Sequence, residues 1–83
     1  MKEEVGNGKV INVMENYNLS NIIVDGKFFT ALLNQKEDLS KIKDLGTFDV
    51  KLNNGRMLFD CKIDNETSEG NRIIIRGYFT KFE

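Results

Sequence analysis

The stretch from Thr47 to Asp64, TFDVKLNNGRMLFDCKID, decides the fold class of this chain. Apolar and polar residues alternate on both sides of Asn54-Gly55, and alternation with a period of two indicates strands with one buried face. Asn-Gly is the preferred dipeptide of a two-residue type I′ turn, because both central residues need a positive φ. The stretch therefore predicts a β-hairpin with a well-specified register. The cross-strand pairs expected on its inner face are Leu52–Met57, Val50–Phe59 and Phe48–Cys61.

The outer face of this hairpin contains a local conflict. In the same register Asp49 lies directly opposite Asp60, and like charges facing each other across a strand pair are destabilising. Lys51 and Lys62 are close enough to relieve part of this repulsion diagonally. Two interpretations stay open: a solvated charged face, or a shared carboxylate site that binds a divalent cation or a basic residue of a partner. Asp49 and Asp60 are therefore candidate partner-binding residues.

The composition bounds the size and class of the protein. The chain has 83 residues, of which 40% are hydrophobic and 30% charged, so it is too apolar for disorder. A single domain spanning residues 1–83 is expected, and a chain of this length buries only roughly 60% of its unfolded surface. The net charge of −1 disfavours strong non-specific binding to phosphate backbones. The many asparagines, with no proline or tryptophan, are typical of bacterial or phage proteins from AT-rich genomes.

Several residue types needed for common chemistry are missing. The chain has no histidine and one cysteine, Cys61, which weighs against a hydrolase triad, a multi-cysteine zinc site and an internal disulfide. We therefore expect no enzymatic activity, no catalytic residues, no cofactor and no metal. The start MKEEVGNG has no apolar signal core and no run is long enough to span a membrane, so a cytoplasmic location without membrane contact is expected.

The first part of the chain is expected to be flexible over residues 1–8, which are charged or glycine-rich. A strand is predicted over residues 9–15, where β-branched residues dominate. Asn16-Tyr17-Asn18 is predicted to form the turn that follows.

The segment from Ser20 to Leu33 predicts a second hairpin, with Asp25-Gly26 as its turn. Both of its faces would carry an aliphatic–aromatic pair, Ile22–Phe29 on one and Ile23–Phe28 on the other. We favour a strand pair covered on both faces, as in a curled barrel. In the alternative, one face exposes an apolar patch, and such a patch indicates a partner. Ile23 and Phe28 are the candidate binding residues of that patch.

The segment NQKEDLSKIKDL, residues 34–45, predicts a short helix of roughly three turns over one barrel end. Asn34 is the expected N-cap and Gly46 the residue that ends the helix. The apolar stripe consists of Leu39, Ile42 and Leu45.

A polar loop is predicted over residues 64–71 and a last strand over residues 72–82, with a bulge or sharp bend at Gly77. Outside the core, Arg72, Arg76 and Tyr78 share one face of that strand. Guanidinium groups beside an aromatic ring form a platform for anions or bases. The alternative, which we favour, is that the arginines pair with strand acids such as Asp60 or Asp64.

The element order predicts a mainly β fold with one short helix (α+β): a small antiparallel β-barrel or roll with the OB-like order β-β-β-α-β-β-β. We expect a non-enzymatic binding module that acts through a protein partner, with self-association through the Ile22–Phe29 hairpin as a specific version. One alternative is OB-like binding of single-stranded nucleic acid through Arg72, Arg76 and Tyr78. Another alternative is the sensing of a small ligand or nucleotide.

Overall fold

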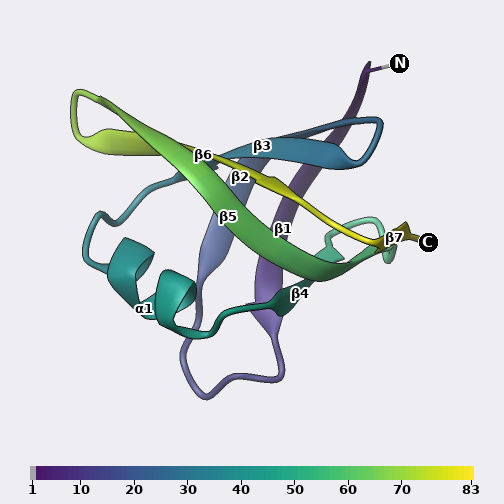
Figure 1. Ribbon diagram of the computed structural model, residues 1–83, viewed down its shortest axis with the longest axis horizontal. Coiled ribbons are helices and arrows are strands. Elements are labelled where there is room, and N and C mark those ends of the chain that lie inside the picture. The colour runs from purple at the N-terminus through teal and green to yellow at the C-terminus, as the bar shows by residue number, and fades with distance from the viewer. Residues whose placement is uncertain (1) are drawn as a thin grey trace.

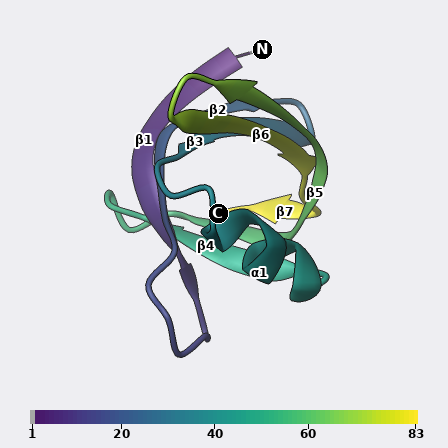
Figure 2. The same cartoon turned by 90° about the vertical axis from the view of Figure 1, so that its left-hand side faces the viewer.

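The computed structural model describes residues 2–83 and consists of an antiparallel sheet with one short helix (Figure 1). The sheet order is β4-β1-β2-β3-β6-β5-β7, and β4 also pairs with β5, so the strands form a ring (Figure 2). The predicted mainly β fold with one helix is confirmed. The elements are β1 (Lys2–Ile11), β2 (Asn18–Asp25), β3 (Phe28–Leu33), α1 (Asp38–Asp44), β4 (Phe48–Leu52), β5 (Met57–Glu69), β6 (Arg72–Tyr78) and β7 (Lys81–Phe82).

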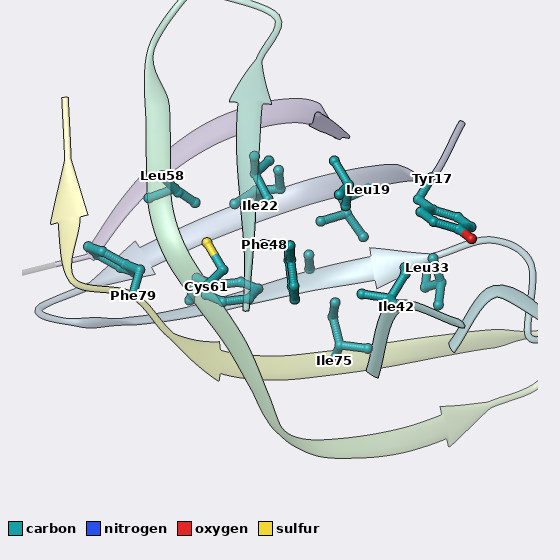
Figure 3. Close-up of a cluster of buried hydrophobic side chains, with 14 of the residues drawn as sticks. Tyr17, Leu19, Ile22, Leu33, Ile42, Phe48, Leu58, Cys61, Ile75 and Phe79 are labelled. Carbon is teal, nitrogen blue, oxygen red and sulfur yellow. The ribbon is translucent and has the colours of Figure 1, made fainter. Parts of the chain in front are cut away.

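The hydrophobic core lies inside the ring, where side chains from opposite strands meet (Figure 3). Phe29 of β3 is its largest fully buried side chain, and Ile42 brings α1 into contact with the same cluster. Within residues 2–83 no polar or charged side chain is buried. The core is therefore held by apolar packing alone.

The β4–β5 hairpin turns differently from the prediction. The N–H of Gly55 donates to the carbonyl oxygen of Leu52 at 2.9 Å, and the N–H of Leu52 donates to the carbonyl oxygen of Arg56 at 2.8 Å. This pattern is a three-residue loop in which only Gly55, with φ 93°, needs a positive φ. The longer loop shifts the neighbouring pairs by one residue.

This shift makes two of the predicted pairs wrong and is then reversed along the hairpin. Val50 pairs with Leu58 instead of Phe59, and Leu58 is the residue that faces the core. A bulge follows on β5, and beyond it Phe48 pairs with Cys61 as predicted. The extra residue in the loop shifts the pairing by one position, and the extra residue in the bulge shifts it back. Beyond the bulge the side chains therefore point to the predicted faces again.

The β2–β3 hairpin is also shifted, since Asp25 pairs with Phe28 and the turn lies at Gly26-Lys27. The predicted pairs Ile22–Phe29 and Ile23–Phe28 are therefore not formed. The assignment of faces holds: Ile22 and Phe29 are buried, whereas Ile23 is half-buried on the outside and Phe28 is 44% exposed. The interpretation that this hairpin is covered on both faces is wrong, and the structure shows the alternative of an exposed apolar face.

The first strand begins at Lys2 instead of residue 9 and ends at Ile11 instead of residue 15. Val5 is buried and the segment pairs with both β2 and β4. The glycines and charged residues of Lys2–Gly8 form a strand, because pairing with β2, and with β4 from Gly8 onward, outweighs their weak β propensity. The expectation for Met1 lies outside the described residues.

Helix α1 is shorter than predicted, and it begins after Glu37, which makes no side-chain capping bond. The predicted cap at Asn34 is therefore wrong, while Gly46 follows the C-cap Leu45 as expected. Ile42 is fully buried, Leu39 packs against the core and Leu45 is exposed, so two of the three residues of the predicted stripe contact the core. It lies at one end of the ring of strands (Figure 2). No helix in the described residues is long and apolar enough to cross a membrane.

The polar segment 64–71 is a continuation of β5 up to Glu69, followed by a turn at Gly70-Asn71, so the predicted loop is wrong. From Asn65 to Glu69 each residue of this arm pairs with β6, for example Thr67 with Ile74. The predicted strand 72–82 divides into β6 and β7. The register irregularity lies on β5 opposite Gly77, between Ile63 and Asn65. The sequence thus predicted a break here but assigned it to the wrong strand.

Candidate partner-binding face

The outward side of β2, β3 and β6 brings together four of the predicted binding residues: Ile23, Phe28, Arg76 and Tyr78. The register aligns Ile23 with Thr30 and Thr30 with Arg76 across the three strands. In the next row Phe28 pairs directly with Tyr78. We call this surface the β2–β3–β6 face and define it by Ile23, Phe28, Thr30, Leu32, Ile74, Arg76 and Tyr78.

The β2–β3–β6 face is apolar and accessible. Phe28 is 44% exposed and Tyr78 is 40% exposed, although large aromatic side chains are usually buried. Ile23, Leu32 and Ile74 are half-buried around them. Single exposed apolar residues are common on protein surfaces, but a contiguous group on one sheet face indicates an interaction site.

Arg76 provides the positive charge of this face. Its Cζ atom lies 5.0 Å from the centroid of the Phe28 ring, within the range of a cation–π contact. The side chain thus leans from β6 toward β3. None of the ion pairs found among residues 2–83 involves Arg72 or Arg76. The favoured expectation that these arginines pair with Asp60 or Asp64 is therefore not met.

Two open depressions flank Phe28, so its ring stands between them. The first has a volume of about 520 Å³ and includes Ile23, Thr30 and Arg76 in its lining. The second lies toward β6, where Tyr78 and Phe79 contribute to its wall. Because the guanidinium of Arg76 covers one side of the Phe28 ring, a partner's side chains can contact its edge and its other side.

Arg72 lies on the same side of β6 but toward the end of the β5–β6 arm, where it pairs in register with Glu69. Ile74 separates it from Arg76 along the strand. The two predicted arginines therefore share a face without forming one compact site, and Arg76 is the one that lies among the aromatic residues.

Asp49 and Asp60 meet each other, but on a different part of the surface. The N–H of Asp60 donates to Oδ1 of Asp49 at 3.0 Å, and the hydroxyl of Thr80 donates to Oδ2 of Asp60 at 3.0 Å. A hollow beside them is also lined by Leu45 and Thr47, which follow α1. The predicted direct opposition of the two carboxylates is wrong, because the β5 bulge puts a backbone donor between them.

The structure gives no support for a metal site in this region. Among the described residues there is no group of three or more acidic, cysteine or histidine side chains positioned to hold a metal ion. Cys61 is fully buried beside the bulge, and burial, helped by the charges of Asp49 and Asp60, raises the pKa of its thiol to about 12. The thiol therefore stays protonated and packs as a small hydrophobic group.

Three residues of the β2–β3–β6 face were not among the predicted binding residues, namely Thr30, Leu32 and Ile74. A signal existed for Leu32 and Ile74. Alternation in FFTALL places Leu32 on the same side as Phe28, and alternation in RIIIRGY places Ile74 on the same side as Arg76. What the sequence could not supply was the pairing of β3 with β6, which joins the two sets.

The chain was compared with known proteins at the level of families, curated sequences and solved structures. No family model, no curated protein and no solved structure matches it. The function must therefore be argued from the surface itself.

Proposed function

We propose that this chain is a non-enzymatic binding module that docks a protein partner on its β2–β3–β6 face. The observation that carries the proposal is the direct cross-strand pair of exposed aromatic residues, Phe28 and Tyr78. The pair lies within a larger apolar surface and beside a guanidinium group that has no carboxylate partner within residues 2–83.

The residue types of this face are those that dominate binding energy at protein interfaces. Tyrosine and arginine are enriched among interface residues whose truncation costs more than ~2 kcal/mol. Burying the aromatic and aliphatic groups removes apolar area from water, which contributes about 25 cal/mol per Å². The near-neutral charge of the chain, −1, favours an apolar protein surface over a polyanion as the partner.

The proposal is tested by affinity capture with the tagged chain from the cells that produce it. Ile23→Asp puts a charge on the β2 side of the face without emptying the core, since Ile23 is half-buried on the outside. The matched control is Lys51→Asp on β4, across the ring, where Lys51 is exposed. Capture of a defined protein by wild type and Lys51→Asp, and its loss in Ile23→Asp, is expected. A protein captured equally by all three would contradict docking on this face.

Single-stranded nucleic acid is the second candidate, and one observation favours it. Phe28 and Tyr78 stand side by side next to the guanidinium of Arg76, and aromatic rings with arginine form sequence-tolerant stacking platforms. An OB-like arrangement of the strands would suit this function. The test is titration with a fluorescent single-stranded oligonucleotide at low salt. Binding that weakens steeply as salt rises and is lost in Arg76→Glu supports this candidate, and no binding at low salt excludes it.

A further inference from the structure

One row of side chains crosses the binding face and continues onto β1. Glu4 pairs with Ile23, Ile23 with Thr30, and Thr30 with Arg76, so the row runs over β1, β2, β3 and β6. Because directly paired residues point to the same side of a sheet, Glu4 faces outward together with Arg76. The row therefore has an acid at one end, a base at the other, and an apolar and a neutral polar residue between them.

A row of this kind is complementary to itself. In a two-fold symmetric contact, the same patch is used by both copies, and residue i meets residue j while j meets i. A two-fold axis parallel to the strands, between β2 and β3, places Glu4 opposite the second copy's Arg76 and Arg76 opposite the second copy's Glu4. The same rotation places Ile23 opposite the second copy's Thr30, and Phe28 opposite the second copy's Asp25.

We propose that the partner of the β2–β3–β6 face is a second copy of this chain, held by two reciprocal Glu4–Arg76 ion pairs. This inference rests on the proposed function, since it names the protein that docks there. It narrows the expectation of self-association through the Ile22–Phe29 hairpin to the outer face of that hairpin, because Ile22 and Phe29 themselves are buried in the core.

Two features of the separate chain fit this contact. Neither Glu4 nor Arg76 takes part in the ion pairs found within residues 2–83, so both charges are available to a partner. Arg76 leans over the Phe28 ring, with its Cζ 5.0 Å from the ring centroid. Its charge therefore lies over the middle of the face, where the second copy can reach it despite the curvature of the sheet.

The charges also specify the orientation of the two copies. A two-fold axis perpendicular to the strands and through the same row would place Arg76 against the second copy's Arg76. Like charges in contact oppose association. Only the axis parallel to the strands pairs opposite charges, so the row selects one arrangement.

The experiment is a charge-reversal series measured by sedimentation velocity over a range of concentrations. Wild type is expected to form a dimer, and the single variants Glu4→Arg and Arg76→Glu are expected to stay monomeric where wild type is dimeric. The double variant, E4R with R76E, restores the opposite charges and is expected to regain the dimer. Lys51→Glu on β4 is the matched control and should dimerise like wild type, and circular dichroism verifies that all variants are folded.

Three outcomes would overturn the inference: a wild type that stays monomeric at every concentration, single variants that dimerise like wild type, or a double variant that does not recover. Each is distinct from failure of the proposed function. A monomeric wild type whose capture of another protein is lost in Ile23→Asp would retain the docking face but assign it a different partner. Equal capture by Ile23→Asp, with no dimer, would remove both.

Discussion

The backbone N–H of Asp60 donates a 3.0 Å hydrogen bond to Oδ1 of Asp49, so two acids that face each other in a simple hairpin are linked here instead of repelling. Asp60 has φ 54°, a conformation that costs roughly 1–2 kcal/mol for a residue other than glycine. The hydroxyl of Thr80 holds its carboxylate from the other side. These contacts fix the bulge that returns β5 to the register of Phe48 with Cys61.

Replacing Asp49 by alanine should therefore destabilise the bulge. The variant loses the acceptor of the Asp60 N–H, and we expect the free energy of unfolding to fall by about 1 kcal/mol. For a domain of this size that corresponds to a melting temperature lower by about 4–8 °C. Asp49→Asn keeps an oxygen acceptor and should lose less than half as much. Urea denaturation of both variants is the measurement, and equal losses would show that the bond does not hold the bulge.

The sequence predicted which residues face the core better than it predicted which residues pair. Alternation assigned the faces of β6 correctly, because its burial pattern has a period of two throughout. In the β4–β5 hairpin the pairs failed near the turn, since Asn54-Gly55 fits both a two-residue turn and a three-residue loop with glycine last. The bulge at Asp60 leaves no mark in the sequence, because its position is set by the hydrogen bonds that Asp60 donates to Asp49 and accepts from Thr80.

The candidate face was half predictable for a related reason. Ile23, Phe28, Arg76 and Tyr78 each stood out locally as an apolar, aromatic or basic residue on the outer side of a strand. Their assembly depends on the pairing of β3 with β6, which joins residues 40 to 50 positions apart in the chain. Local periodicity carries no information about such a contact, so the sequence treated the two groups as separate sites.

Gly77 is predicted to be irreplaceable because two strands approach each other closely at this position. A Cβ atom there would lie 2.2 Å from the carbonyl oxygen of Lys62 and 2.7 Å from Cε1 of Phe29. We expect Gly77→Ala to lose about 3 kcal/mol or more of folding free energy, at the upper end of the cost of overpacking. Replacing the Phe29 ring by leucine (Phe29→Leu) in the Gly77→Ala chain should not restore stability, since the clash with the backbone carbonyl of Lys62 remains. Denaturant titration measures both, and an Ala variant as stable as wild type would contradict the close approach.

The loop after β1 predicts an unusual tyrosine titration. The hydroxyl of Tyr17 donates to Oε2 of Glu15 at 2.8 Å, and this bond raises the pKa of Tyr17 to about 12. Because the folded-state pKa lies above the ordinary value of 10.0, the stabilisation is complete below pH 10 and is lost as the pH rises toward 12. In a Tyr78→Phe chain, where Tyr17 is the remaining tyrosine, tyrosinate absorbance should therefore appear near pH 12.

The control for this titration is Glu15→Ala in the same single-tyrosine chain. It removes the acceptor and its negative charge, both of which raise the pKa of Tyr17. The midpoint of the Tyr17 titration should then move down toward 10. A midpoint near 10 in the chain that retains Glu15, measured while circular dichroism shows the native fold, would contradict the hydrogen bond.

Phe82 of β7 is predicted to stabilise the ring of strands. Its phenyl group meets that of Phe79 edge to face, with centroids 6.2 Å apart. The phenyl group of Phe82 also contacts Arg56, whose Cζ lies 3.7 Å from the ring centroid. Nη1 of the same guanidinium is 2.9 Å from Oε2 of Glu3. Phe82 thus connects β7 with Phe79 in the segment after β6, with the β4–β5 loop and, through Arg56, with β1.

Phe82→Ala should lower the free energy of unfolding by about 2 kcal/mol, less than for a fully buried phenylalanine, because this ring is only half-buried. Phe82→Leu retains apolar contact but loses the aromatic face, so it separates burial from the cation–π contact. A double-mutant cycle with Arg56→Ala is expected to give a coupling of about 0.5–1 kcal/mol between Arg56 and Phe82. The coupling should vanish in a second cycle whose starting chain carries Phe82→Leu, because that chain has no aromatic ring at this position. A coupling of zero in the wild-type cycle would mean that Arg56 stabilises the chain through Glu3 alone.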